Sequence, residues 1–246
     1  MKLKFLFVPA LLALIAVPYF SHAQYPGEKF KMEDIRSIIL EDFEKNDRGW
    51  QVSESRFATE GFPMIKPSVE GAPIALSSFF YEEGQFKYVL GVRSSFTRKG
   101  YNRVSVYPKE EIVIPGWVKK LDVWVWGANY YYNLEAHLRD YRGIVYRVPL
   151  GSLHFMGWRN LSAVVPQQIP QFIRYLPMEK PLTFVRFVIW TEPAERVDDY
   201  MIYFDHLKVM TDVYKERFDG DRFADNWREI WPPEAGPQSG PKGKGE

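Results

Sequence analysis

Cysteine is absent from this chain of 246 residues, and several other features that mark common protein classes are also missing. Without cysteine there can be no disulfide scaffold, no Cys-ligated zinc or iron–sulfur site and no thiol nucleophile. The chain also has no large net charge: it contains 32 basic and 31 acidic residues, and the formal net charge is +1. Since nucleic-acid binding requires a basic patch, this balance argues against a nucleic-acid partner.

Sequence motifs of catalysis are missing as well. There is no G-x-S-x-G nucleophile elbow and no glycine-rich phosphate loop before a helix. His137, His154 and His206 do not fall at the short spacings with which a strand or a helix presents two metal ligands. We therefore predict no catalytic residue and no cofactor. A glycosidase-type pair of carboxylates stays open, because such acids lie far apart in sequence.

The N-terminal region carries the pattern of an export signal. Lys2 and Lys4 precede the apolar run 5–17, and Ser21-His22-Ala23 offers the small-x-small pattern that signal peptidase recognises. The run of about 13 residues is shorter than the ~20 that a spanning helix needs, and no later run is long enough. We predict that residues 1–23 are a signal peptide cleaved after Ala23, so that the mature chain is exported without a membrane span.

Short runs rich in Val, Ile, Tyr, Phe and Trp, separated by Gly, Pro and Asn, fill most of the mature chain. Such residues suit a pleated, half-buried surface, and about ten short strands with turns between them indicate a β-sandwich. We predict one all-β sandwich domain over residues 24–211. The first strand should include Ile38–Leu40 and Asp42–Glu44. The other predicted strands are 74–79, 86–92, 103–106, 121–126, 134–138, 144–148, 159–165, 182–190 and 201–210.

The alternation of residue types assigns faces to three of these strands, because successive side chains point to opposite sides. In 121–126 the aliphatic residues share one face, while Trp124 and Trp126 lie side by side on the other. In 134–139 apolar residues alternate with Glu135, His137 and Arg139, as in a strand with one dry and one wet face. Residues 182–190 are apolar on both faces except at Arg186, which predicts a central strand.

The C-terminal region differs from the domain before it. In the charged segment 212–231, Phe223, Trp227, Ile230 and Trp231 recur at spacings of three and four, which places them on one face of a short helix. Pro232-Pro233 ends that helix. Residues 232–246 are rich in Gly, Pro, Lys and Ser and are predicted to be a disordered tail. The tail tryptophans must pack either on their own sandwich or on another molecule.

Aromatic residues, 17% of the chain, are its one unusual feature. Most are expected to fill the core between two sheets. Tyr130, Tyr131 and Tyr132 follow Gly127-Ala128-Asn129 in a turn or at a strand edge. Tyrosine and tryptophan are enriched at protein contacts, so we predict partner contacts at Tyr130, Tyr131, Tyr132, Trp227 and Trp231. The three tyrosines could equally form a platform on which a sugar stacks.

A series of motifs resembles the galactose-binding-like jelly rolls of carbohydrate-binding modules. The first is Asp42-Phe43-Glu44 with Trp50, followed by Leu-x-Val-Trp-Val-Trp-Gly at 121–127, Leu-Arg-Asp-x-x-Gly at 138–143 and an aromatic-x-Asp-x-aliphatic strand at 203–209. The resemblance covers residues 40–210. Some such jelly rolls hold a structural cation between their first and last strands. By that resemblance, Glu44 and Asp205 are the candidate ligands.

A narrower resemblance is to the spirochaete flagellar filament outer layer proteins, the class A sheath proteins of periplasmic flagella. It is carried by the signal peptide, Ile-Leu-Glu-Asp-Phe-Glu at 39–44, Pro-Gly-Trp-Val-Lys at 115–119 and Trp-Arg-Asn-Leu at 158–161. The resemblance implies a non-enzymatic periplasmic protein that coats the flagellin core with other sheath proteins and supports motility. The alternatives are a secreted carbohydrate-binding protein, suggested by fold analogy alone, and a glycan-active enzyme.

Overall fold

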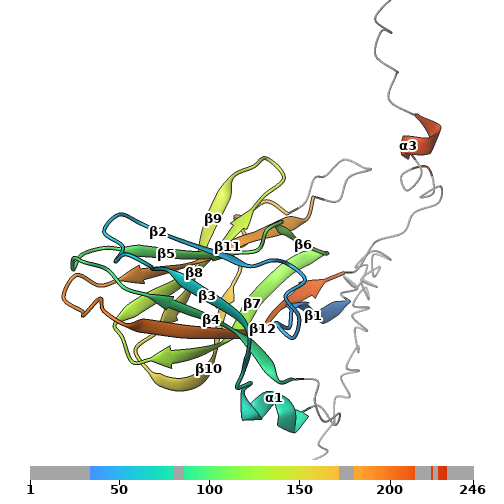
Figure 1. The fold of residues 1–246 in the computed structure, drawn as a ribbon. Helices are drawn as coiled ribbons and strands as arrows, with labels where there is room; N and C mark the ends of the chain where they lie inside the picture. The colour runs from blue at the N-terminus through green and yellow to red at the C-terminus, as the bar shows by residue number, and fades with distance from the viewer. Residues whose placement is uncertain (1–33, 80–85, 172–179, 214–222, 224–226, 232–246) are drawn as a thin grey trace, which may run out of the picture. The chain divides into compact units, whose positions relative to one another are not determined.

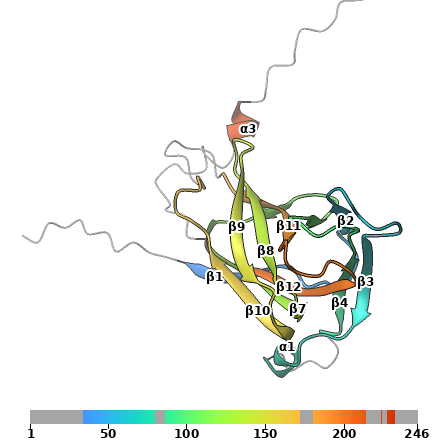
Figure 2. The ribbon, with the colours of Figure 1, turned by 90° about the vertical axis from the view of Figure 1, so that its left-hand side faces the viewer.

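The computed structural model describes residues 34–79, 86–171, 180–213, 223 and 227–231. Within these residues two six-stranded antiparallel sheets are stacked face to face, as Figures 1 and 2 show. The predicted all-β jelly-roll sandwich is confirmed. No helix in the described part of the chain has the length and apolar character needed to cross a membrane.

We call the sheet that contains the last strand sheet A. Its strands run in the order β10-β7-β12-β4-β3, and β1 pairs with β12 off this path. Sheet A consists of β1 (Ile35–Glu41), β3 (Met64–Glu70), β4 (Tyr88–Ser94), β7 (Trp117–Ala128), β10 (Met156–Val164) and β12 (Tyr200–Asp212).

We call the other sheet sheet B. Its strands run in the order β2-β5-β11-β8-β9, and β6 pairs with β11 off this path. Sheet B consists of β2 (Gln51–Glu54), β5 (Arg103–Tyr107), β6 (Ile112–Ile114), β8 (Tyr132–Arg139), β9 (Val145–Ser152) and β11 (Leu182–Thr191). The predicted central position of 182–190 is confirmed, since β11 lies in the middle of the sheet.

Strand β12 has two different neighbours along one of its edges. Its first part, Tyr200–Phe204, pairs with β4, and its last part, from Leu207 onward, pairs with β1. Asp205 and His206 fall in the gap between these two neighbours. The pairing of β12 with β7 also shifts between Asp205 and Lys208, and His206 has a positive φ of 49°. This junction therefore contains an irregularity of the kind that re-aims side chains in a sheet.

The core lies between the two sheets and is built by the inward-facing residues of every long strand. Phe187 of β11 stacks on Phe204 of β12 with ring centroids 4.9 Å apart, and both side chains are fully buried. Trp50, which precedes β2, packs on the Phe187 ring with ring centroids 6.3 Å apart. The predicted dry faces of two strands are confirmed, because Leu121, Val123 and Val125, as well as Leu134, Ala136 and Leu138, are at most 1% exposed.

Residues 74–79 form a helix, α1 (Ile74–Phe79), so the strand predicted there is wrong. Pro73 precedes the helix, and its carbonyl accepts a hydrogen bond from the Leu76 amide at 3.0 Å. Proline fits the start of a helix because its φ is already helical and it needs no amide partner. In Figures 1 and 2, α1 lies beyond sheet A, on the side away from sheet B.

The predicted first strand extends only to Glu41, so Asp42–Glu44 belong to the following loop. Strands β2, β3 and β6 were not predicted. At the C-terminus, α3 (Trp227–Ile230) confirms a short helical segment at the predicted place. The predicted signal peptide 1–23 and the predicted tail 232–246 lie outside the described residues.

Gly116 controls how β7 begins beside the end of β12, and we predict that Gly116→Ala lowers the free energy of unfolding by about 2–4 kcal/mol. Its φ is +74°, and an added Cβ would lie 2.5 Å from the Asp212 carbonyl oxygen. Gly143→Ala is the matched control, since its φ is +86° but no atom lies within 4 Å of an added Cβ. Urea denaturation should show the larger loss at Gly116; equal losses would contradict the steric explanation.

Candidate interaction surface

The outer faces of the two sheets differ sharply in chemistry. Residues that pair directly across neighbouring strands share a face, so the strand registers define rows of side chains on each outer surface. Large exposed apolar residues on the strands of sheet A are Ile35, Ile39, Met64, Trp117, Met156, Val164 and Met210, whereas on the described strands of sheet B only Val113 is of this kind. Because a sandwich normally exposes polar outer faces, sheet A is the exception.

One half of the outer face of sheet A is made of methionine and aromatic side chains. Trp158, Trp126 and Tyr203 lie in one row across β10, β7 and β12. Trp126 meets the Tyr203 ring edge-to-face at 5.5 Å. The tyrosine ring in turn lies over Gly91 of β4, where an added Cβ would be 3.0 Å from it.

The next row outward on this half consists of methionine and arginine. Met201 pairs with Arg93, and Arg93 pairs with Met64, while Met156 lies at the other edge of the sheet. Met156 is 69% exposed and Met64 is 52% exposed. We call these two rows the methionine–tryptophan face, defined by Met64, Trp126, Met156, Trp158, Met201 and Tyr203.

The other half of this outer face carries a second apolar group. Ser37, Met210, Lys120 and Val164 form one row across β1, β12, β7 and β10, and Ile35, Asp212 and Trp117 form the next. We call Ile35, Ile39, Trp117, Val164 and Met210 the C-terminal patch, because β12 ends within it. A polar belt separates it from the methionine–tryptophan face; in this belt Asp122 accepts a hydrogen bond from Asn160 and lies 3.6 Å from the Lys208 ammonium.

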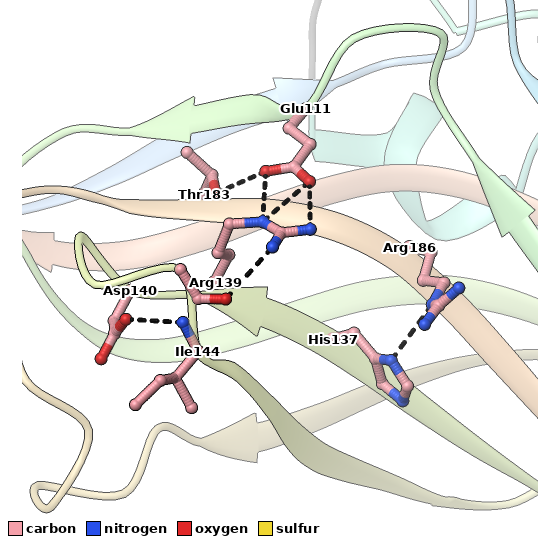
Figure 3. Close-up of polar contacts among 8 residues, drawn as sticks. Glu111, His137, Arg139, Asp140, Ile144, Thr183 and Arg186 are labelled. Atoms are coloured by element: carbon pink, nitrogen blue, oxygen red, sulfur yellow. Dashed lines mark hydrogen bonds and ion pairs between the residues drawn. The ribbon is translucent and has the colours of Figure 1, made fainter.

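The outer face of sheet B is polar, and many of its charged groups are paired with one another (Figure 3). Arg139 donates to both carboxylate oxygens of Glu111 at 3.0 Å, and Thr183 donates to the same carboxylate. Burial alone would raise the pKa of Asp140, but hydrogen bonds from the Ile144 amide and from Arg142 outweigh it and hold that pKa below its usual range. These contacts form a self-contained polar surface.

His137 lies in the middle of this polar surface and is 8% exposed. Arg186 donates from Nε to His137 Nδ1 at 3.2 Å, so the imidazole proton resides on Nε2, which faces Glu135 Oε2 at 3.4 Å (Figure 3). Trp190 donates to the same Glu135 oxygen. Burial, together with the charge of Arg186, lowers the pKa of His137. Glu135, His137 and Arg139 lie on the outer face of β8, as predicted, but His137 is buried there in a hydrogen-bonded network and is not exposed to solvent.

Two of the three consecutive tyrosines predicted as partner contacts belong to the core. Tyr130 is 3% exposed and Tyr132 is fully buried, and both rings pack on Tyr200. Their hydroxyls donate to the carbonyls of Asp198 and Arg196, which ties the loop before β12 to the sandwich. Tyr131 lies in the turn between β7 and β8 and is 55% exposed. The predicted contact surface is therefore reduced to Tyr131 at this position, and its partner stays a prediction.

Tyr131 contacts the loop that leads into β10, the strand of Met156 and Trp158. Its ring stacks on His154 at 3.6 Å, and His154 comes two residues before Met156. Of the two tail tryptophans predicted as contacts, Trp231 is 75% exposed, and Trp227 begins α3. Trp124 and Trp126 lie on the outer face of sheet A, as predicted, and both are half-buried. The methionines of the face were missed because they stand at strand ends, where sequence alternation is weakest.

Asp205 and Glu44, the candidate cation ligands, lie near the gap between β1 and β4. Asp205 is fully buried, and neither of its carboxylate oxygens has a hydrogen-bond partner among the described residues. Burial raises its pKa to about 8, and the charges of Glu44 and Asp42 act in the same direction, while the His206 amide opposes them. Glu44 accepts hydrogen bonds from the amides of Lys87 and Tyr88, at the start of β4.

A buried carboxylate whose oxygens have no hydrogen-bond partner is a potential ligand of a hard cation, and the charges of Glu44 and Asp42 act on Asp205. Asp205 would be its principal ligand, and Glu44 would contribute charge while it also holds β4. The described residues contain no cluster of three acidic or histidine side chains arranged around one point. A cation here would neutralise Asp205 and tie β12 to the adjoining loop, which is a structural contribution.

Comparison with known proteins gives similarity of two kinds. A sequence profile described as flagellar filament outer layer protein matches residues 81–219. A protein of Brachyspira hyodysenteriae (strain ATCC 49526 / WA1), described as flagellar filament outer layer-like, is 32% identical over 202 residues, which cover 82% of this chain and 91% of that protein. The similarity thus extends over most of the described sandwich.

Solved structures with a similar arrangement include carbohydrate-binding modules. One, from the β-sandwich superfamily, has 9% sequence identity and a TM-score of 0.42, with 68% of this chain covered; the chain spans 58% of that protein, less than two thirds of its length. The family 11 module of a Clostridium thermocellum cellulosomal cellulase has 11% identity and a TM-score of 0.41, covering 75% of this chain and 99% of the module.

Proposed function

The chain belongs to the flagellar filament outer layer protein family, and we propose on that basis that it is a structural subunit of the sheath around the flagellin core of a periplasmic flagellum. In this role it is exported by the signal peptide 1–23 and has no catalytic activity. It supports filament shape and motility together with other sheath proteins.

The observation that carries the proposal is the apolar outer face of sheet A. Contiguous exposed apolar surface marks a contact site, and methionine and tryptophan are enriched in protein interfaces. The polar outer face of sheet B, where Arg139, Glu111 and His137 are already paired within the sheet, is suited to face solvent. A sandwich with one contact face and one solvent face is the geometry that a single coating layer requires.

The methionine–tryptophan face, together with Tyr131, is the contact that we assign to the filament. Met156 and Met64 stand out from the sheet at its two edges, and the aromatic row of Trp158, Trp126 and Tyr203 lies between the edges. Methionine adapts its shape to an uneven surface, while the half-buried rings are held in place. Because many copies bind one filament, each contact can be modest and the layer still be stable.

The test of the function is the protein composition of flagellar filaments purified from a strain that lacks this chain. We expect loss of an outer-layer component with the flagellin core intact, and altered swimming, since the sheath contributes stiffness or curvature. The strain complemented with the intact gene is the control and should recover both. Unchanged filament composition together with unchanged swimming would contradict the proposal.

A further inference from the structure

The C-terminal patch is a second apolar surface, and it lies apart from the face assigned to the filament. Ile35 is 48% exposed, Ile39 46%, Met210 38% and Val164 74%. Along β12, Met210 stands nine positions from Met201, roughly 30 Å at about 3.3 Å per residue, while the nearest members of the two groups, Trp126 and Ile39, lie in rows four positions apart on β7. The belt of Asp122 and Lys208 lies between them. We therefore expect the C-terminal patch to be covered by a different contact from the one that covers the methionine–tryptophan face.

Strand β12 ends within the C-terminal patch, so the C-terminal part of the chain starts from there. Asp212, at the end of β12, lies in the row between Ile35 of β1 and Trp117 of β7. The next described residue after Val213 is Phe223, and nine intervening residues can span at most about 30 Å. Four neighbouring strands are only about 15 Å across, so a segment that starts at Asp212 can reach any part of the patch.

The chain after β12 also has exposed apolar side chains that could cover the patch. Phe223 is 66% exposed, Ile230 45% and Trp231 75%. Residues 219–231 contain four acids and two arginines. In the rows of the patch and next to it, Lys120 and Lys208 are balanced by Asp122 and Asp212, so the match between the two sides of the contact is one of apolar surface.

We propose that Phe223, Ile230 and Trp231 pack on the C-terminal patch of their own sandwich. A tether this short gives the segment a local concentration in the millimolar range, far above that of a second copy in solution, so the chain's own segment is favoured as occupant. The inference goes beyond the proposed function: it assigns the tail tryptophan region to the sandwich itself and leaves the methionine–tryptophan face as the surface for the filament.

The absence of cysteine permits a direct test with pairs of introduced thiols. In the full mature chain, Val164→Cys combined with Ile230→Cys places one thiol on the patch and one on the segment. The matched control pair is Met64→Cys with Ile230→Cys, because Met64 is 52% exposed on the same outer face but at its opposite end. Both pairs are treated in dilute solution with a short bismaleimide cross-linker and read by gel mobility and peptide mass spectrometry.

We expect the Val164–Ile230 pair to cross-link within one chain at least tenfold faster than the Met64–Ile230 pair. Equal rates, or no intramolecular product, would overturn the proposal. Covalent dimers as the main product would overturn it in favour of a second copy as occupant. Circular dichroism melting of each variant verifies that the sandwich is folded, and the purified protein needs no filament, so this result is independent of the test of function.

Discussion

Replacing Met64 and Met156 together by lysine should reduce incorporation of the protein into filaments by more than tenfold while its melting temperature stays unchanged. Both side chains are more than half exposed, so their loss removes little buried contact from the free protein. In a filament contact, each lysine would bring a charge into a surface that excludes water, which is costly without a partner. A tenfold loss corresponds to about 1.4 kcal/mol of binding free energy per copy, which two charges introduced into a contact can readily account for.

Val113→Lys is the control for this pair. Val113 is 59% exposed on β6 and lies in sheet B, so the substitution adds one lysine, against two in the methionine variant, to the face that we assign to solvent. Incorporation is measured as the ratio of this protein to flagellin in purified filaments. If Val113→Lys lowers that ratio as much as the double methionine variant does, the assignment of sheet A as the contact face is wrong.

Asp205→Asn should make the protein progressively more stable than the wild type as the pH rises from about 5 to 8, in the presence of a chelator. The pKa of Asp205 is raised to about 8 in the folded chain by burial. In the unfolded chain it returns to about 4. Between these values the folded state holds a proton that the unfolded state releases, so the stability contributed by this group is complete below pH 4 and is lost as the pH rises toward 8.

The slope of such a loss is at most about 1.4 kcal/mol per pH unit, so the variant should gain about 3 kcal/mol over the wild type between pH 5 and 8. Asparagine has the shape of the protonated acid and removes the titration. Asp47→Asn, on the exposed loop after Glu44, is the control and should run parallel to the wild type. The measurement is urea denaturation at fixed temperature across this pH range.

The same urea denaturation is repeated with millimolar calcium and without chelator. A cation that binds the ionised Asp205 would stabilise the folded wild type at pH 8, because ligands that bind only the folded state add to its stability. The Asp205→Asn variant should show a smaller effect. Equal shifts in both proteins would contradict the predicted cation site, and parallel pH profiles in chelator would contradict the effect of burial on Asp205.

The strands that sequence patterns predicted are those whose burial is uniform along one face. In 121–126 and 134–139 the alternation of aliphatic with other residues is regular, and β7 and β8 place those aliphatic residues in the core. Strands β2, β3 and β6 escaped prediction because they are short or polar: β3 contains Lys66 and Pro67, and no residue in it is fully buried. Residues 74–79 are apolar enough for a strand, but Pro73 starts a helix there.

The candidate site was predicted less well, because exposure depends on what covers a residue. Tyr130 and Tyr132 appear in the sequence as part of a run of contact residues, yet the loop before β12 folds over them and uses their hydroxyls. Met64 and Met156 are separated by 92 positions in the chain, and only the pairing of β3 with β4, of β4 and β7 with β12, and of β7 with β10 brings them to one face.

Composition and the alternation of residue types by themselves indicated the fold class, because a chain without cysteine depends on burying its aromatic residues for stability, and short β-rich runs bury them between stacked sheets. Family membership followed from the order of local motifs, which strand pairing does not alter. The identity of the exposed surface was decided by tertiary structure alone. Whether an apolar side chain belongs to the core or to a contact surface depends on the sheet and the face on which it lies. Strand pairing and register determine both, and they are relations between residues that are distant in the sequence.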